Sequence, residues 1–160
     1  MVEQYEPASD FLKAIIAEEA PLSGSPLAEE NMRRLIAMTR DYDVSNRDWA
    51  TMILSMEEAD TPAIRQALLS AAADANEIVR AEALVGIARR DRKLALPLVL
   101  EALSSEWASM PVFEAAALVA DPALVDALQR WIEPSEDEWL DQQALEALAA
   151  CEQGVSTSHS

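Results

Sequence analysis

The sequence predicts an all-α fold in which pairs of helices stack side by side. Three observations indicate this fold: apolar residues recur at helical spacing, turn residues separate the helical stretches, and one pattern repeats after 33 residues. The repeated pattern is Asp41, Arg47 and Ala50, which recur as Asp74, Arg80 and Ala83. A period of this length is typical of stacked helical arrays.

The first half of the chain contains four expected helices, each preceded by a capping or turn residue. Ser9 can cap a helix over 9–20, and the Pro- and Ser-rich stretch 21–26 ends it. A second helix over 27–40 leads through the turn 41–43 to its partner over 44–56. Thr61 can cap the next helix, 62–73, and Pro62 fits the first turn of that helix.

The second half continues the pattern with five further helices. Asp74 and Asn76 provide the turn and cap for 77–89, and the turn 90–92 precedes 94–104. A less regular connection, 105–110, leads to 112–120, and Asp121 caps a helix to about Ile132. The last helix is expected from Pro134-Ser135 to about Cys151, with Ser135 and Glu138 at capping-box spacing. Residues 1–153 are predicted to form one domain and 154–160 a disordered tail.

The second helices of the four pairs align with an alanine at the central position. These alanines are Ala50, Ala83, Ala116 and Ala144. A larger side chain at this position is expected to clash with the paired helix. The shared alanine therefore predicts helices that pack with matched geometry.

These residues resemble the HEAT-repeat family, including the short bacterial repeats of the phycobilisome-lyase type. Asp74 with Val79-Arg80 and Ala83 matches the family unit, whereas the third unit has Trp107 and Phe113 at the Asp and Arg positions. The resemblance covers about 27–150. It implies a right-handed α-solenoid of about four helical hairpins plus an N-terminal helix.

The resemblance also implies a structural ladder of ion pairs between neighbouring repeats. Asp41 or Asp74 would pair with Arg47 or Arg80, and Arg80→Ala would then destabilise the fold. An unchanged melting temperature would count against this ladder.

The net charge of −17 restricts the classes of partner. Residues 94–160 alone contain twelve acidic groups and one basic group, Arg130. Nucleic acids and anionic membranes would be repelled, whereas a basic protein or peptide would be attracted. With one cysteine, no leading signal peptide and no long apolar run, the expected location is the cytoplasm.

Second helices line the concave face of HEAT-like arrays, so the resemblance implies a partner-binding groove. Its residues are Asp48, Trp49, Met52, Glu82, Val85, Glu114, Leu118, Gln142 and Glu146, with Trp107 and Phe113 at its edge. The apolar members could equally be packing residues. A tryptophan near a helix end can anchor a partner or simply fill space beside a loop.

The sequence gives no firm pattern for catalysis, a cofactor or a metal ion. Cys151 is expected to be an apolar filler, and His159 is in the tail. The favoured hypothesis is a non-enzymatic protein-binding scaffold for a basic or amphipathic segment. Three alternatives remain: an acidic inhibitor or immunity-type protein masking a basic toxin or nuclease, a lyase accessory, and a DNA glycosylase-like enzyme using Asp48, Trp49 and Trp139.

Overall fold

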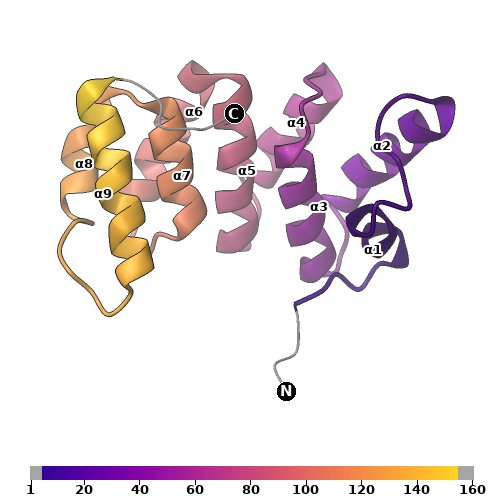
Figure 1. Ribbon diagram of the computed structural model, residues 1–160, viewed down its shortest axis with the longest axis horizontal. Coiled ribbons are helices and arrows are strands. Elements are labelled where there is room, and N and C mark those ends of the chain that lie inside the picture. The colour runs from indigo at the N-terminus through magenta and orange to yellow at the C-terminus, as the bar shows by residue number, and fades with distance from the viewer. Residues whose placement is uncertain (1–4, 155–160) are drawn as a thin grey trace. The chain divides into compact units, whose positions relative to one another are not determined.

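The structure, a computed structural model, describes residues 5–154 and is helical throughout, with no strand among them (Figure 1). The chain divides into two compact units, one ending at Arg80 and the other beginning at Ala81. This boundary falls inside α5 (Glu77–Arg90). Of the tail expected over 154–160, residues 155–160, including His159, lie outside the described residues.

The first unit contains α1 (Asp10–Ile16), α2 (Pro26–Met38), α3 (Val44–Met56), α4 (Pro62–Ala71) and the start of α5. Each predicted cap is formed: the hydroxyls of Ser9 and Thr61 accept the amides of Leu12 and Ile64. Helix α3 packs against α1, α2 and α4 and is therefore the central element of this unit. The core side chains are Leu12, Leu35, Ala50, Leu54, Ile64 and Leu68, none more than 1% exposed.

The second unit contains the rest of α5, α6 (Arg92–Leu103), α7 (Met110–Val119), the 3₁₀ turn η1 (Pro122–Leu124), α8 (Val125–Gln129) and α9 (Glu138–Gln153). Helix α7 packs between α6 and α9. The ring of Phe113 on α7 is buried edge-on to Trp131, with the ring centroids 5.9 Å apart. The Trp131 indole N–H also donates to the Leu103 carbonyl at 2.9 Å, which ties the end of α6 to the connection before α9.

The predicted alanine positions are confirmed as buried. Ala50, Ala83 and Ala116 have no exposed surface, and Ala144 is 1% exposed. On α7 and α9 the close approach is direct, because the Cys151 thiol lies 3.5 Å from the Ala116 carbonyl. Cys151 is itself buried, as expected of an apolar filler.

Two element predictions in the second unit are wrong. The helix expected over 121–132 is interrupted, because Asp121 caps a 3₁₀ turn at Pro122 before α8 begins. Helix α9 begins at Glu138 rather than at Pro134-Ser135. Its N-cap is Asp137, and the Ser135 amide and hydroxyl bind Asp141 instead of forming the expected capping box with Glu138.

Candidate functional site

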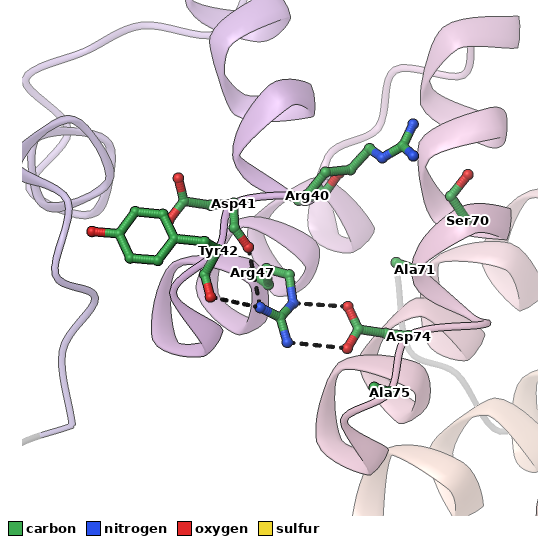
Figure 2. A pocket seen from close by; sticks show the side chains of 9 residues that line it. Arg40, Asp41, Tyr42, Arg47, Ser70, Ala71, Asp74 and Ala75 are labelled. Carbon is green, nitrogen blue, oxygen red and sulfur yellow. Dashed lines mark hydrogen bonds and ion pairs between the residues drawn. The ribbon is translucent and has the colours of Figure 1, made fainter.

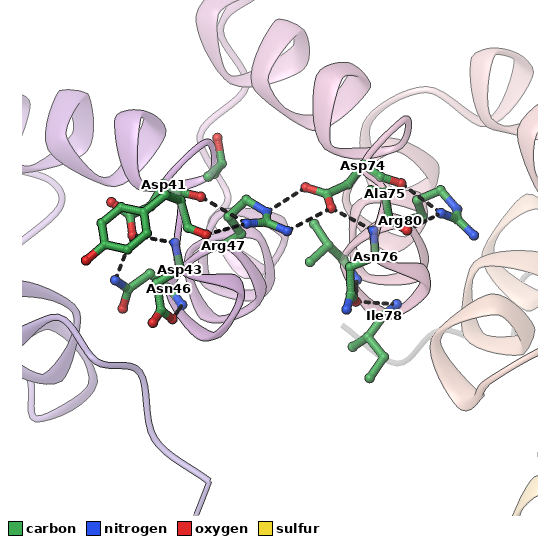
Figure 3. Close-up of polar contacts among 12 residues, drawn as sticks. Asp41, Asp43, Asn46, Arg47, Asp74, Ala75, Asn76, Ile78 and Arg80 are labelled. Atoms are coloured by element: carbon green, nitrogen blue, oxygen red, sulfur yellow. Dashed lines mark hydrogen bonds and ion pairs between the residues drawn. The ribbon is translucent and has the colours of Figure 1, made fainter.

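The candidate site is the side of the first turns of α3 that contacts residues 5–9, defined here as the α3 face: Ser45, Asn46, Asp48 and Trp49. The turn before α3 is fixed by its own carboxylates, as Figure 3 shows. Asp43 caps the helix by accepting the amides of Ser45 and Asn46, and Asp41 accepts the Asp43 amide and the Asn46 side-chain amide. The Ser45 hydroxyl, followed by these amide hydrogen bonds, holds the pKa of Asp43 below its ordinary value. These contacts hold the side chains of Ser45 and Asn46 in place.

A non-helical segment of the same chain, with a bend at Ala8, lies on the α3 face. This strap, residues 5–9, is anchored at one end by its backbone: the Ala8 amide donates to the Ser45 hydroxyl at 3.2 Å, and the Ser9 amide donates to Asn46 Oδ1 at 2.8 Å. At its other end the Tyr5 hydroxyl donates to Asp48 Oδ2 at 3.0 Å. The Tyr5 ring stacks on Trp49, with centroids 5.9 Å apart and planes at 23°.

Asp48 is a half-buried carboxylate whose contact with the strap is a neutral hydroxyl. Burial raises the pKa of Asp48, and the hydrogen bond from Tyr5 counteracts only part of that rise. Burial, the hydrogen bond to Asp48 and the charges of Asp48 and Asp43 together raise the pKa of Tyr5 to about 12. Among residues 5–154 no lysine or arginine forms an ion pair with Asp48. The α3 face is therefore anionic and short of a cation.

Trp49 adds a second unsatisfied group to the α3 face. Its ring nitrogen is buried and has no hydrogen-bond partner among the described residues. A buried donor without an acceptor costs stability, so such groups are uncommon in folded proteins. Met52 follows one turn further along α3 and is half-buried.

The expected structural ladder forms in one place, between Arg47 and Asp74. Arg47 donates to both carboxylate oxygens of Asp74, at 2.9 Å from Nε and 3.3 Å from Nη2. The same guanidinium donates to the carbonyls of Asp41 and Tyr42 at 3.1 Å each. Arg47 thus joins the turn before α3 to the turn before α5 (Figure 3).

The other two ladder residues have different partners. Arg80 donates to the carbonyls of Asp74 and Ala75, at 2.7 and 3.2 Å. The Asp41 carboxylate holds its own turn rather than an arginine. Arg47 and Asp74 therefore connect the two turns, whereas Asp41 and Arg80 each stabilise their own turn.

An open pocket of about 420 Å³ surrounds the Arg47–Asp74 pair (Figure 2). It is lined by residues of the two turns and of α4: Thr39, Arg40, Asp41, Tyr42, Arg47, Ser70, Ala71, Asp74 and Ala75. The ring of Tyr42 points away from the Asp74 carboxylate and is 95% exposed. Arg47 and Asp74 in this pocket pair with each other, whereas Arg40 lines it without an ion pair among residues 5–154.

The structure corrects several residues of the predicted groove. Val85 and Leu118 are buried, and Phe113 is 1% exposed, so none of the three can contact a partner as expected. Phe113 and Leu118 are buried because α7 packs between α6 and α9 and buries six of its ten residues. Val85, Leu118 and Phe113 are therefore packing residues.

The remaining predicted site residues are accessible in part or in full. Asp48, Trp49, Met52 and Glu82 are half-buried, whereas Glu114, Gln142 and Glu146 are exposed, and Gln142 donates to Glu146 at 3.2 Å. Trp107 is 45% exposed at the connection between α6 and α7, and Trp139 is 73% exposed. Tyr5 contacts both Asp48 and Trp49 and so brings these two predicted residues together.

Sequence reasoning missed Tyr5, Ser45 and Asn46. One signal for Asn46 was present, because an amide stands there where the equivalent helices have Val79 and Val112. Asn46 is nonetheless buried, at 7% exposed, since both ends of its side chain are hydrogen-bonded. Tyr5 had no such signal.

Residues 5–154 contain neither a cluster of side chains that could hold a metal ion nor a helix that could span a membrane. Between residues 5 and 154, no three His, Cys, Asp or Glu side chains gather in a way that could hold a metal ion. Within the same range, no helix combines the length and apolar character needed to cross a bilayer.

The fold and the α3 face define a class: an all-helical protein in which one helix receives a non-helical chain segment. No family model matches the sequence. Protein YibA of Escherichia coli K12 and its counterpart in strain O157:H7 are each 26% identical over 114 residues, which is 71% of this chain. The chain spans only 41% of the length of these curated relatives.

The X-ray structure of E. coli YibA shares the fold. It aligns with a TM-score of 0.59 and 21% sequence identity, covering 87% of this chain and 54% of that chain. The likeness extends to the helical architecture alone.

Proposed function

We propose that this protein is a non-enzymatic protein-binding module that holds an extended, basic segment of a partner on the α3 face. Its helical pairs would stack as a right-handed, HEAT-like solenoid. The 33-residue repeat, the four buried alanines and the likeness to the YibA structure support that arrangement. The groups of the α3 face are a hydroxyl, an amide, a carboxylate and an indole, and each can recognise a chain segment without reacting with it.

The observation that carries the proposal is the strap lying on the α3 face. Ser45 and Asn46 accept consecutive backbone amides, and these contacts do not depend on the side chains of the bound segment. Trp49 offers a flat surface for stacking, and Asp48 offers an acceptor beside it. Backbone acceptors give affinity for an extended chain, and the pair of side chains gives selectivity for one residue of it.

The negative charge of the α3 face favours a positively charged residue in the bound segment. Asp48 lacks an ion-pair partner among residues 5–154, and Asp43 lies close enough to act on Tyr5. The net charge of −17 would also attract a basic partner over a distance of about 8–10 Å at moderate salt. These features favour a lysine- or arginine-containing segment.

A matched pair of charge-neutralising variants tests the proposal. Asp48→Asn and Glu58→Gln each remove one negative charge from the first unit, but Glu58 is an exposed residue outside the α3 face. Binding of a fluorescent arginine-containing peptide, measured by anisotropy with the full chain, should weaken about tenfold or more in Asp48→Asn, because a hydrogen bond to a charged group is lost. Glu58→Gln should bind nearly as the wild type does.

Two outcomes would contradict the proposal. Absence of binding to the wild-type chain at low salt would remove the partner-binding role. Equal weakening by both variants would show that net charge, rather than the α3 face, determines the affinity.

A further inference from the structure

We propose that the strap is an internal stand-in for the partner: the partner segment displaces residues 5–9 and places an arginine where the Tyr5 ring lies. This inference rests on the proposed function and adds two things to it. It names the residue that the α3 face selects, and it makes the strap a competitor that the partner must remove.

The tyrosine end of the strap is held by exposed contacts, whereas its other end is anchored more firmly. The hydrogen bonds made by Tyr5 and Ala8 are exposed, and the Tyr5 side chain is itself exposed despite its stacking on Trp49. Pro7 is buried and Ser9 also caps α1, so a partner that displaces the whole strap must replace these contacts. The salt bridge between Lys13 and Glu6 spans 4.0 Å between exposed groups, so it adds little. Segments held by a few exposed contacts open locally without unfolding the rest of the domain.

Tyrosine satisfies the α3 face incompletely. It offers a single neutral donor to a half-buried carboxylate, and no cation among residues 5–154 pairs with Asp48. An arginine at the same place can lie flat on the Trp49 indole, as Tyr5 does, and can donate two N–H groups to the carboxylate. Lysine would supply the charge but neither the flat stacking surface nor the paired donors.

The chain uses the same arginine-on-ring contact in another part of the first unit. The Arg34 guanidinium lies over the Phe11 ring, with its carbon 3.9 Å from the ring centroid. Among residues 5–154, no carboxylate forms an ion pair with Arg34. An arginine on Trp49 would have both the ring and Asp48, so it should outcompete the neutral Tyr5.

The experiment measures competition between the strap and two matched peptides in the full chain. One peptide copies the strap sequence Tyr-Glu-Pro-Ala-Ser, and the other differs only by arginine in the first place. Binding is followed by NMR through the indole N–H signal of Trp49, which is assigned with Trp49→Phe. Circular dichroism checks that Tyr5→Ala, which alters a side chain outside the core, keeps the helical fold.

Three results are expected. The arginine peptide binds the wild-type chain at least about fivefold more tightly than the tyrosine peptide, because a charged, paired donor replaces a neutral one. Tyr5→Ala binds the arginine peptide about tenfold more tightly than the wild type, since the fraction of chains with a free site rises. In Asp48→Asn the preference for arginine is lost.

The failures are distinguishable. If Tyr5→Ala leaves the affinity unchanged while Asp48→Asn abolishes the preference, the α3 face binds partners but the strap does not compete for it. If the two peptides bind equally, the selection of arginine is wrong. If neither peptide moves the Trp49 signal in Tyr5→Ala, the α3 face is not a peptide site, and the proposed function fails with the inference.

Discussion

At the scale of single residues, Arg47 forms the ion pair with Asp74, whereas the repeat pattern predicted such pairs for both Arg47 and Arg80. Its side chain is 19% exposed and that of its partner Asp74 is 10% exposed, so the pair is largely withdrawn from water. Arg47 also satisfies two backbone carbonyls in the turn before α3. Removing it would leave the mostly buried Asp74 carboxylate without its ion-pair partner, with only the Asn76 amide still donating to it among residues 5–154, and would take the Arg47 donor from two carbonyls.

Arg47→Ala should therefore destabilise the protein by about 3 kcal/mol, the order found when one partner of a buried pair is removed. Arg33 provides a control, because its bond to Glu30 joins two side chains that are both more than half exposed. Arg33→Ala should change the unfolding free energy by less than about 1 kcal/mol. Urea denaturation of both variants measures the difference, and similar values for the two would show that the pair at Asp74 has no structural importance.

Tyr5 offers a second residue-scale prediction, because its environment changes its acidity. In a Tyr42→Phe background, Tyr5 is the remaining tyrosine, so absorbance reports its ionisation alone. The phenol should titrate near pH 12 rather than at the ordinary value of 10. The folded chain holds this proton more tightly than the unfolded chain, so the strap contact is at full strength below pH 10 and is lost as the pH rises through 12.

Asp48→Asn should lower that titration midpoint without restoring it fully. The variant removes the effects of the Asp48 hydrogen bond and charge, but burial, the largest cause, remains. A midpoint near 10 in the parent protein would show that Tyr5 does not rest on the α3 face in solution.

At the scale of elements, α7 shows what the shared alanine does. Ala116 is fully buried, and its carbonyl lies 3.5 Å from the Cys151 thiol of α9. A leucine at this position must push the two helices apart. Ala116→Leu should cost roughly 1–3 kcal/mol, the range for overpacked cores.

Ala149 provides the comparison on the neighbouring helix. It is exposed on α9, so Ala149→Leu should change stability by no more than about 0.5 kcal/mol. Thermal or urea unfolding of the two variants tests the packing directly. Equal stability would mean that the alanines at the repeated position are accidental.

Elements with a strong local signal could be predicted, and those without one could not. Ser9 and Thr61 each accept a backbone amide three residues further along the chain, and the turn 41–43 comes directly before α3. These local signals indicated from the sequence alone where α1, α3 and α4 begin. Ser135 also had cap spacing, but Asp141 competes for its amide and hydroxyl, and α9 begins later. Ser135 and Asp137 are both possible cap residues within one helical turn, and their spacing in the sequence does not show which of them begins α9.

The candidate site was half predictable for a similar reason. Asp48 and Trp49 follow from the helical register of α3, whereas Tyr5 reaches Asp48 across 43 positions of sequence without any repeat to indicate it. The burial of Leu118 was missed because the register assumes one open side on every second helix. Helix α7 packs against both α6 and α9, so that assumption fails there.

At the scale of the whole molecule, the charge of −17 should act on the rate of encounter with a basic partner. Long-range attraction accelerates association, whereas the short-range contacts of the α3 face determine how long a bound segment stays. The two effects can be separated by salt, because the screening length falls from about 30 Å at 0.01 M to about 3 Å at 1 M.

Stopped-flow measurements with the arginine peptide should show an association rate that falls about tenfold or more across that range of salt. The dissociation rate should change much less, since stacking on Trp49 and the amide contacts at Ser45 and Asn46 are not screened in the same way. Asp48→Asn should produce the reverse pattern, with faster dissociation and a nearly unchanged salt slope, because it removes one close contact and only one of many charges. An association rate indifferent to salt would show that the acidic surface does not guide the partner, and the binding would then depend on the contacts of the α3 face alone.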